Sequence, residues 1–184
     1  MFRHLQRRKR FAAAETRFII AELAAALVHA HKHKVAYRDV KPENVLFGGT
    51  GHVLLADFGL SKIVQIDDKD FPTKGCISLC GTPEYMAPEV LDRAPYGGSV
   101  DWWALGMVLY ELLTGLPPWY TKDRSKLLLR LRSAPLKFPT YVSARAQSFV
   151  GGLLERRPAQ RLGANAARGG AAECRAHPFF EGLD

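Results

Sequence analysis

The chain has 184 residues, of which 47% are hydrophobic and 24% are charged, with a net charge of +8. These values exclude a disordered or fibrous chain and suffice for one domain with a hydrophobic core. A basic run without any acid occupies the first ten residues. No nucleic-acid-binding motif accompanies this run, so we interpret it as a solvated basic face rather than a nucleic-acid contact.

The cysteines and the apolar segments indicate in which cellular compartment the protein is expected to lie. Cys76, Cys80 and Cys174 are odd in number and lack zinc-site spacing, which indicates a reducing environment and no zinc site. The most apolar segment, residues 102–113, contains Glu111 and is too short to span a bilayer. Charged residues rather than an apolar stretch follow Met1, so we expect no signal peptide. We therefore expect a cytoplasmic protein without a membrane span, with the nucleus as the alternative.

The first half of the chain predicts one helix and one hairpin. Residues 12–32 carry apolar side chains at helical spacing, and a polar loop follows at residues 38–44. Residues 45–47 and 53–55 are apolar and flank a glycine-rich turn, which predicts an antiparallel hairpin. The polar stretch 61–81 is long for a loop, and such loops are usually functional or mobile.

The second half predicts three helices. Residues 99–114 are apolar on most sides, which is typical of a buried helix. Ser99 is expected to cap this helix and Gly115 to end it. Shorter helices are expected at residues 123–133 and 143–155. The sequence therefore predicts a mainly helical domain with one small β-hairpin.

Polar residues gather at one end of the predicted hairpin. Asn44 precedes the first strand and Asp57 follows the second, so antiparallel pairing places both at the same open end. Asp39 and Lys41 lie in the loop that enters this end. Carboxylate and amide oxygens suit a magnesium ion. On geometry alone, an ordinary polar turn is an equal alternative.

Three sequence motifs decide between these alternatives. Residues 37–44, Tyr-Arg-Asp-Val-Lys-Pro-Glu-Asn, resemble the catalytic loop of protein kinases. Asp57-Phe58-Gly59 resembles the metal-binding motif of these enzymes, and Ala87-Pro88-Glu89 resembles the motif that closes their activation segment. Each tripeptide alone is weak, but the three in this order are not expected by chance.

The resemblance is narrower than the protein kinase family as a whole. Lys41, two residues after Asp39, is typical of serine/threonine kinases, and Tyr37 in place of histidine is common in the AGC group. Further AGC-like segments are residues 80–89, 100–103, 161–163 and 177–180.

This resemblance implies a role for each residue of the hairpin end. Asp39 would be the catalytic base, Lys41 would neutralise charge on the transferred phosphoryl group, and Thr82 would hydrogen-bond near both. The residues implied to bind ATP and its magnesium ions are Lys41, Glu43, Asn44 and Asp57, with Asn44 and Asp57 as the metal ligands.

The resemblance also implies a regulatory phosphorylation site. Arg38 would pair with a phosphate on the activation segment, and Ser78 would carry that phosphate after modification by an upstream kinase. Residues 65–75 look like an insertion relative to AGC kinases.

Substrate binding and structural roles follow in the same way. Glu43, Glu84 and Glu111 match acids that bind substrate arginines, which implies protein substrates with basic residues near the target serine or threonine; ordinary exposed carboxylates are the alternative. The residues with implied structural roles are Glu89 and Arg161, as an ion pair, and Asp101, which would brace the catalytic loop. Trp102, Trp103 and His177 are expected to be packing residues.

The resemblance covers residues 1–184, from just after the hinge between kinase lobes to the last helix. The Gly-rich loop and the paired strand lysine and helix glutamate of kinases do not occur. The implied fold is a kinase-like large C-terminal lobe without the small N-terminal lobe, with an apolar docking cleft exposed. We expect a piece of an active ATP-dependent serine/threonine kinase with little activity by itself; the alternative is an inactive one-lobe binding or regulatory protein. The retained Asp39 and Asp57 favour the kinase.

Overall fold

The structure is a computed structural model that describes residues 1–64, 76–165 and 168–183. Its helices, in chain order, are α1 (Phe2–Arg8), α2 (Ala13–Lys32), α3 (Pro88–Leu91), α4 (Ser99–Thr114), α5 (Arg124–Ser133), α6 (Ala144–Leu153) and α7 (Ala171–Arg175). Short 3-10 turns lie at Pro42–Asn44, Pro83–Tyr85, Pro158–Gln160 and Pro178–Phe180. The proposed insertion at residues 65–75 lies outside the described residues.

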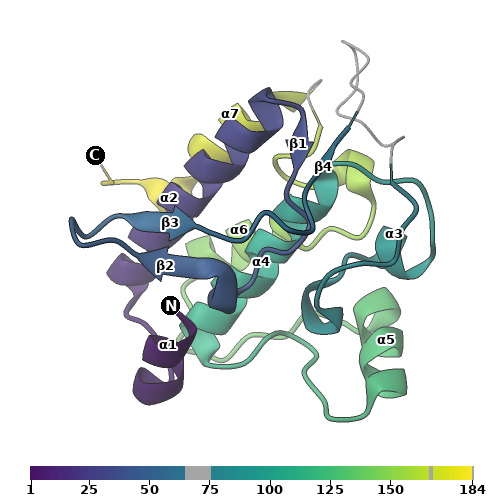
Figure 1. The fold of residues 1–184 in the computed structure, drawn as a ribbon. Helices are drawn as coiled ribbons and strands as arrows, with labels where there is room; N and C mark the ends of the chain where they lie inside the picture. Colours follow the sequence, from purple (N-terminus) through teal and green to yellow (C-terminus); the bar gives the residue numbers. More distant parts are fainter. Residues whose placement is uncertain (65–75, 166–167, 184) are drawn as a thin grey trace.

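Helix α4 lies in the middle of the helical part, with α2 and α6 packed against it (Figure 1). Trp102 and Trp103 are almost fully buried, as the apolar pattern of this helix predicts. Gly115 ends α4 in the left-handed conformation, with φ 94°. His177 packs on Phe149, with ring centroids 4.9 Å apart, so its expected packing role is confirmed.

One expectation for α4 is wrong. Gly98, and not Ser99, precedes the first turn, and Ser99 is a buried residue of the helix itself. Its hydroxyl has no hydrogen-bond partner within the described part of the chain. Two later helices have side-chain caps that were not predicted: Asp123 accepts from Lys126 N at the start of α5, and Ser143 accepts from Ala146 N at the start of α6.

Two small antiparallel pairs complete the fold. Strands β2 (Val45–Phe47) and β3 (Val53–Leu55) form the predicted hairpin, with Val45 opposite Leu55. A second pair, β1 (Val35–Ala36) with β4 (Lys62–Ile63), was not predicted. Because β1 ends just before the loop 38–44 and β2 begins just after it, both ends of this loop are anchored (Figure 1).

The contact between α4 and α6 depends on a glycine. A Cβ at Gly106 would lie 2.9 Å from both Leu153 Cβ and Leu154 Cδ2. We expect Gly106→Ala to lower the free energy of unfolding by about 1–3 kcal/mol, because it overpacks this contact. Gly151→Ala, where a Cβ meets no atom within 4 Å, should instead raise it by about 0.5–1 kcal/mol through helix propensity. Urea unfolding of both variants measures the contrast, and similar effects of one sign would contradict it.

Candidate active site

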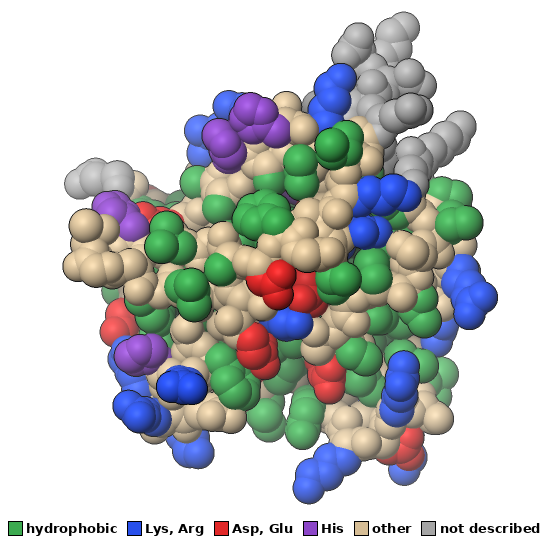
Figure 2. Space-filling model, viewed as in Figure 1, with side chains coloured by type: hydrophobic (Ala, Val, Ile, Leu, Met, Phe, Trp, Pro, Cys, Tyr) green, Lys and Arg blue, Asp and Glu red, His purple; other side chains and the backbone are tan. Residues whose placement is uncertain are grey.

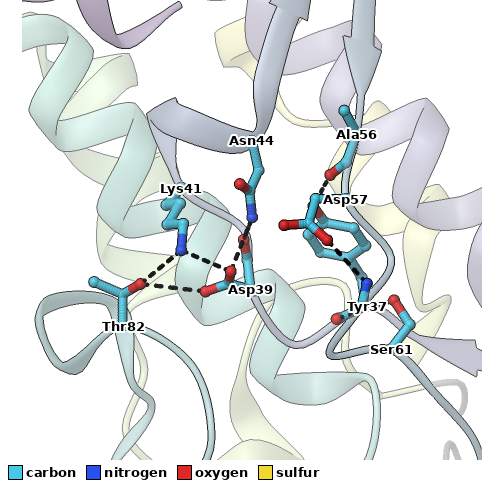
Figure 3. A network of polar contacts seen from close by, with 9 residues as sticks. Tyr37, Asp39, Lys41, Asn44, Ala56, Asp57, Ser61 and Thr82 are labelled. Atoms are coloured by element: carbon cyan, nitrogen blue, oxygen red, sulfur yellow. Dashed lines mark hydrogen bonds and ion pairs between the residues drawn. The ribbon is translucent and has the colours of Figure 1, made fainter.

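Acidic side chains gather around a basic one in the middle of one face of the molecule (Figure 2). At the centre of the candidate site, Asp39 is 8% exposed. Its Oδ2 lies 2.7 Å from Lys41 Nζ and accepts a hydrogen bond from Asn44 Nδ2 at 2.9 Å, while its Oδ1 accepts one from Thr82 Oγ1 at 3.3 Å. Lys41 also donates to Thr82 at 3.0 Å (Figure 3). The surrounding groups therefore fix the orientation of the Asp39 carboxylate.

Asn44 and Asp57 lie at the open end of the hairpin, as predicted. The ladder extends one pair beyond the strands, because Ala56 N donates to Asn44 O at 2.9 Å. Asp57 follows with φ 62°, and its Oδ1 accepts from Gly59 N at 3.0 Å. In Figure 3 the Asp57 carboxylate points toward Asn44.

These two residues fit a magnesium ion. The Asn44 amide directs its NH₂ group to Asp39, so its Oδ1 is not used in that contact. Asp57 is exposed and has a second carboxylate oxygen. Magnesium is usually held by one or two carboxylates, together with substrate phosphates and water. Within the described residues, no group of three or more His, Cys, Asp or Glu is arranged around a metal position.

Asp101, at the start of α4, lies beneath the loop. Its Oδ2 accepts from Tyr37 N at 2.9 Å and its Oδ1 from Arg38 N at 2.7 Å. His31 Nε2 lies 2.8 Å from Oδ2. The sequence reasoning missed His31, although it continues the apolar stripe of α2 four residues after Leu27.

Tyr37 connects the loop to the residues around Asp57. Its hydroxyl donates to the carbonyl of Ala56, and its ring meets Phe58 edge-on at a centroid distance of 5.1 Å. Burial raises the pKa of the Tyr37 hydroxyl, so it remains a hydrogen-bond donor at neutral pH. The segments before Asp39 and before Asp57 are thereby held together.

Comparison with known proteins places this arrangement in a family. Residues 1–180 match the protein kinase domain family. The chain belongs to the protein kinase family. Its relatives include protein kinase 2 of Dictyostelium discoideum (44% identity), serine/threonine-protein kinase YPK1 of Saccharomyces cerevisiae (48%) and serine/threonine-protein kinase Sgk3 of Mus musculus (45%). All three matches cover 100% of this chain, but 36%, 26% and 35% of the respective relative. The expected AGC-type serine/threonine kinase resemblance is confirmed.

The segment around Ser78 meets the loop 38–44 at Arg38. Arg38 Nη1 donates to Ser78 Oγ at 3.1 Å, and its Nε donates to Leu60 O at 2.7 Å. Ser78 is exposed, and its carbonyl accepts from the Tyr96 hydroxyl at 2.7 Å. The sequence reasoning missed Tyr96, which is 2% exposed and also pairs its backbone with Cys76. Arg38 and Ser78 are thus in direct contact.

Three acids line one groove beside the loop 38–44. Glu43, Glu84 and Glu111 border a groove of about 700 Å³, together with Tyr85 and residues of α1. Glu111 is 6% exposed, and its Oε2 accepts from the Tyr85 hydroxyl at 2.5 Å. Glu111 is therefore not an ordinary exposed carboxylate, whereas Glu43 is exposed.

The burial of Glu111 changes its protonation. Desolvation raises the pKa of its carboxyl to about 7, against the opposing effect of the Tyr85 hydrogen bond, and the charges of Glu43 and Glu84 raise it further. A cation that enters the groove would favour the ionised form.

Glu89 and Arg161 form a buried ion pair. The two guanidinium nitrogens donate to the two carboxylate oxygens at 2.6 and 3.0 Å. Arg161 is fully buried and also donates to Ser99 O and Glu155 O. The segment 87–89 is thus fixed to α4 and to the loop after α6.

The described residues show no helix with the length and hydrophobicity needed to cross a membrane. All three cysteines are free thiols.

Proposed function

We propose that this chain carries the catalytic residues of an ATP-dependent serine/threonine protein kinase. The observation that supports this most is the Asp39 carboxylate, which Lys41, Thr82 and Asn44 hold beside Asp57. Phosphoryl transfer requires positioning and charge stabilisation more than covalent catalysis by the protein. This arrangement provides a base, a cation and two metal ligands at one edge.

Each residue has a defined part in the proposed reaction. Asp39 would accept the proton of the substrate hydroxyl as the new O–P bond forms and the bond to the leaving phosphate oxygen breaks. Lys41 would stabilise negative charge on the transferred group. Asn44 and Asp57 would hold magnesium, and ATP bound with it would supply the phosphoryl group.

Phosphate transfer to a peptide tests this function. The native protein, isolated from its own cells, is incubated with ATP, Mg²⁺ and a serine peptide that carries arginines before the serine, and mass spectrometry locates the phosphate. We expect phosphoserine that EDTA abolishes. Lack of phosphoserine, with the peptide still bound, would instead support a binding protein.

A non-catalytic binding lobe is the second candidate. Leu46, Leu54 and Phe58 are each about half exposed beside the catalytic loop. These apolar side chains would contact whatever completes the nucleotide site. Binding of a second polypeptide on this surface without any ATP-dependent phosphorylation would favour this candidate.

We further propose that the groove of Glu43, Glu84 and Glu111 binds substrate arginines. Because Glu111 has a pKa of about 7, it becomes charged as the pH rises through neutrality. We expect the KM for an arginine-containing peptide to fall between pH 6 and pH 8. The same peptide with alanine in place of arginine should lack this dependence, as should the Glu111→Gln variant. Parallel pH profiles for both peptides would contradict the assignment.

Phosphorylation of Ser78 is proposed to activate the protein. A phosphate would add about −1.5 to −2 charge at neutral pH within reach of Arg38, in place of a neutral hydroxyl. A charge-assisted hydrogen bond contributes about 1.5–3 kcal/mol, so Ser78→Ala should lower activity by about tenfold or more in protein from cells that phosphorylate it. Equal activity of Ser78→Ala and phosphorylated wild type would refute this role.

A further inference from the structure

The end of α2 carries histidines on opposite sides of the helix. His31 points inward to Asp101, as described above. His29, in the last turn of α2, and His33, the residue that follows the end of α2, lie four residues apart in the sequence, and both are exposed. Their ring centroids are 4.7 Å apart and their planes meet at 54°. Figure 2 shows histidine side chains gathered at the upper edge of the molecule, where α2 ends in Figure 1.

We propose that His29 and His33 form a binding site for a transition-metal dication. Two histidines at i and i+4 on one helix face are a metal-binding arrangement. A metal that binds two imidazole nitrogens at about 2.0–2.1 Å, with an angle of roughly 90–109° between them, holds the ring centres about 4.5–5.2 Å apart. The observed separation of 4.7 Å lies within this interval. The pair thus has the spacing of a chelate before any metal binds.

The ligand chemistry defines the class of metal. Imidazole suits copper, nickel and zinc, whereas magnesium and calcium require oxygen ligands. Among the described residues no third histidine, cysteine or carboxylate joins the pair, so water would complete the coordination. Affinity should follow the general order for divalent metals, in which copper binds most tightly.

Charges near His29 and His33 have opposing effects on the binding of a dication. Lys32 and Lys34 are exposed neighbours in sequence and repel a dication, but salt screens exposed charges over about 10 Å at 0.1 M. The carbonyl end of α2 attracts cations within its last turn. Direct bonds to two nitrogens should outweigh the screened repulsion. A metal bound only to the folded helix would also stabilise the folded chain.

Nickel titration of the whole chain tests the site. We would measure Ni²⁺ binding by calorimetry at pH 7.5, where free imidazole is mostly neutral, and locate the ion by paramagnetic broadening of amide signals. We expect one tight equivalent that broadens signals around residues 29–33, and no comparable binding of Mg²⁺. His29→Ala and His33→Ala should each weaken Ni²⁺ binding by at least about tenfold, because the chelate is lost.

His52→Ala is the matched control. His52 is also exposed, but it contacts Glu22 on α2 rather than a second histidine. Its replacement should leave the Ni²⁺ affinity unchanged. The proposal is overturned if Ni²⁺ binds equally well to both single variants of the pair, if binding is lost only in His52→Ala, or if the ion broadens signals elsewhere.

Discussion

Replacing Asp39 by asparagine should lower phosphate transfer to a serine peptide by about 10²–10⁴-fold, the contribution of a positioned proton acceptor. The asparagine side chain has nearly the same shape as the native one, and its amide oxygen would still accept a hydrogen bond from Thr82. The variant would lose the ion pair with Lys41, which is 2.7 Å long in the native protein, and the ability to take a proton. Steady-state kinetics of phosphate transfer measure the loss.

Asp92→Asn provides the comparison for this variant. Asp92 is an exposed carboxylate that pairs with Arg132 on α5 and is not among the residues that contact Asp39. Its loss should leave activity within about threefold of wild type, since surface pairs contribute at most about 1 kcal/mol. If Asp39→Asn kept wild-type activity, Asp39 would not be the base.

Replacing Glu89 by glutamine should have the largest effect on stability, a loss of about 3–5 kcal/mol in the free energy of unfolding. The substitution leaves the fully buried Arg161 guanidinium without a countercharge. The remaining acceptors of Arg161 are backbone carbonyls such as Ser99 O, at 2.9 Å, and they cannot neutralise it. Chemical denaturation at pH 7 measures the change.

The exposed ion pair between Asp92 and Arg132 provides the comparison for the stability effect of Glu89→Gln. Asp92→Asn breaks an ion pair that is 2.6 Å long, as is the Glu89–Arg161 pair, but the side chain of Arg132 is 38% exposed and that of Asp92 is 54% exposed. We expect it to cost less than about 1 kcal/mol. Equal losses for Glu89→Gln and Asp92→Asn would show that burial does not determine the strength of the Glu89–Arg161 pair.

Local sequence patterns predicted most of the fold and the centre of the site. The periodic apolar residues of α2 and α4 and the glycine-rich turn between β2 and β3 are short-range signals, and the elements lie where these signals place them. Antiparallel pairing alone placed Asn44 and Asp57 at one end of the hairpin. The kinase resemblance added Thr82, which lies 43 residues after Asp39 and reaches it only through the fold.

Features that depend on distant contacts could not be predicted in this way. The two-residue strands β1 and β4 are too short for a periodic signal, and they pair across a separation of 26 or more residues. Helix α1 is only Phe2–Arg8, and its basic sequence resembles a solvated segment. His31 and Tyr96 become site residues because burial leaves them facing Asp101 and Ser78. Helix α4 has the predicted bounds, but Gly98 precedes its first turn, so Ser99 is the first residue of the helix rather than its cap.

The most direct test isolates the native protein with an antibody to this chain and assays it with labelled ATP, Mg²⁺ and the arginine-containing serine peptide. The same assay on cells that express only the Asp39→Asn form provides the background. Our account predicts labelled phosphoserine from the wild-type protein and its loss in the variant. Equal labelling in both would contradict catalysis at Asp39, and peptide binding without labelling in either would contradict kinase activity.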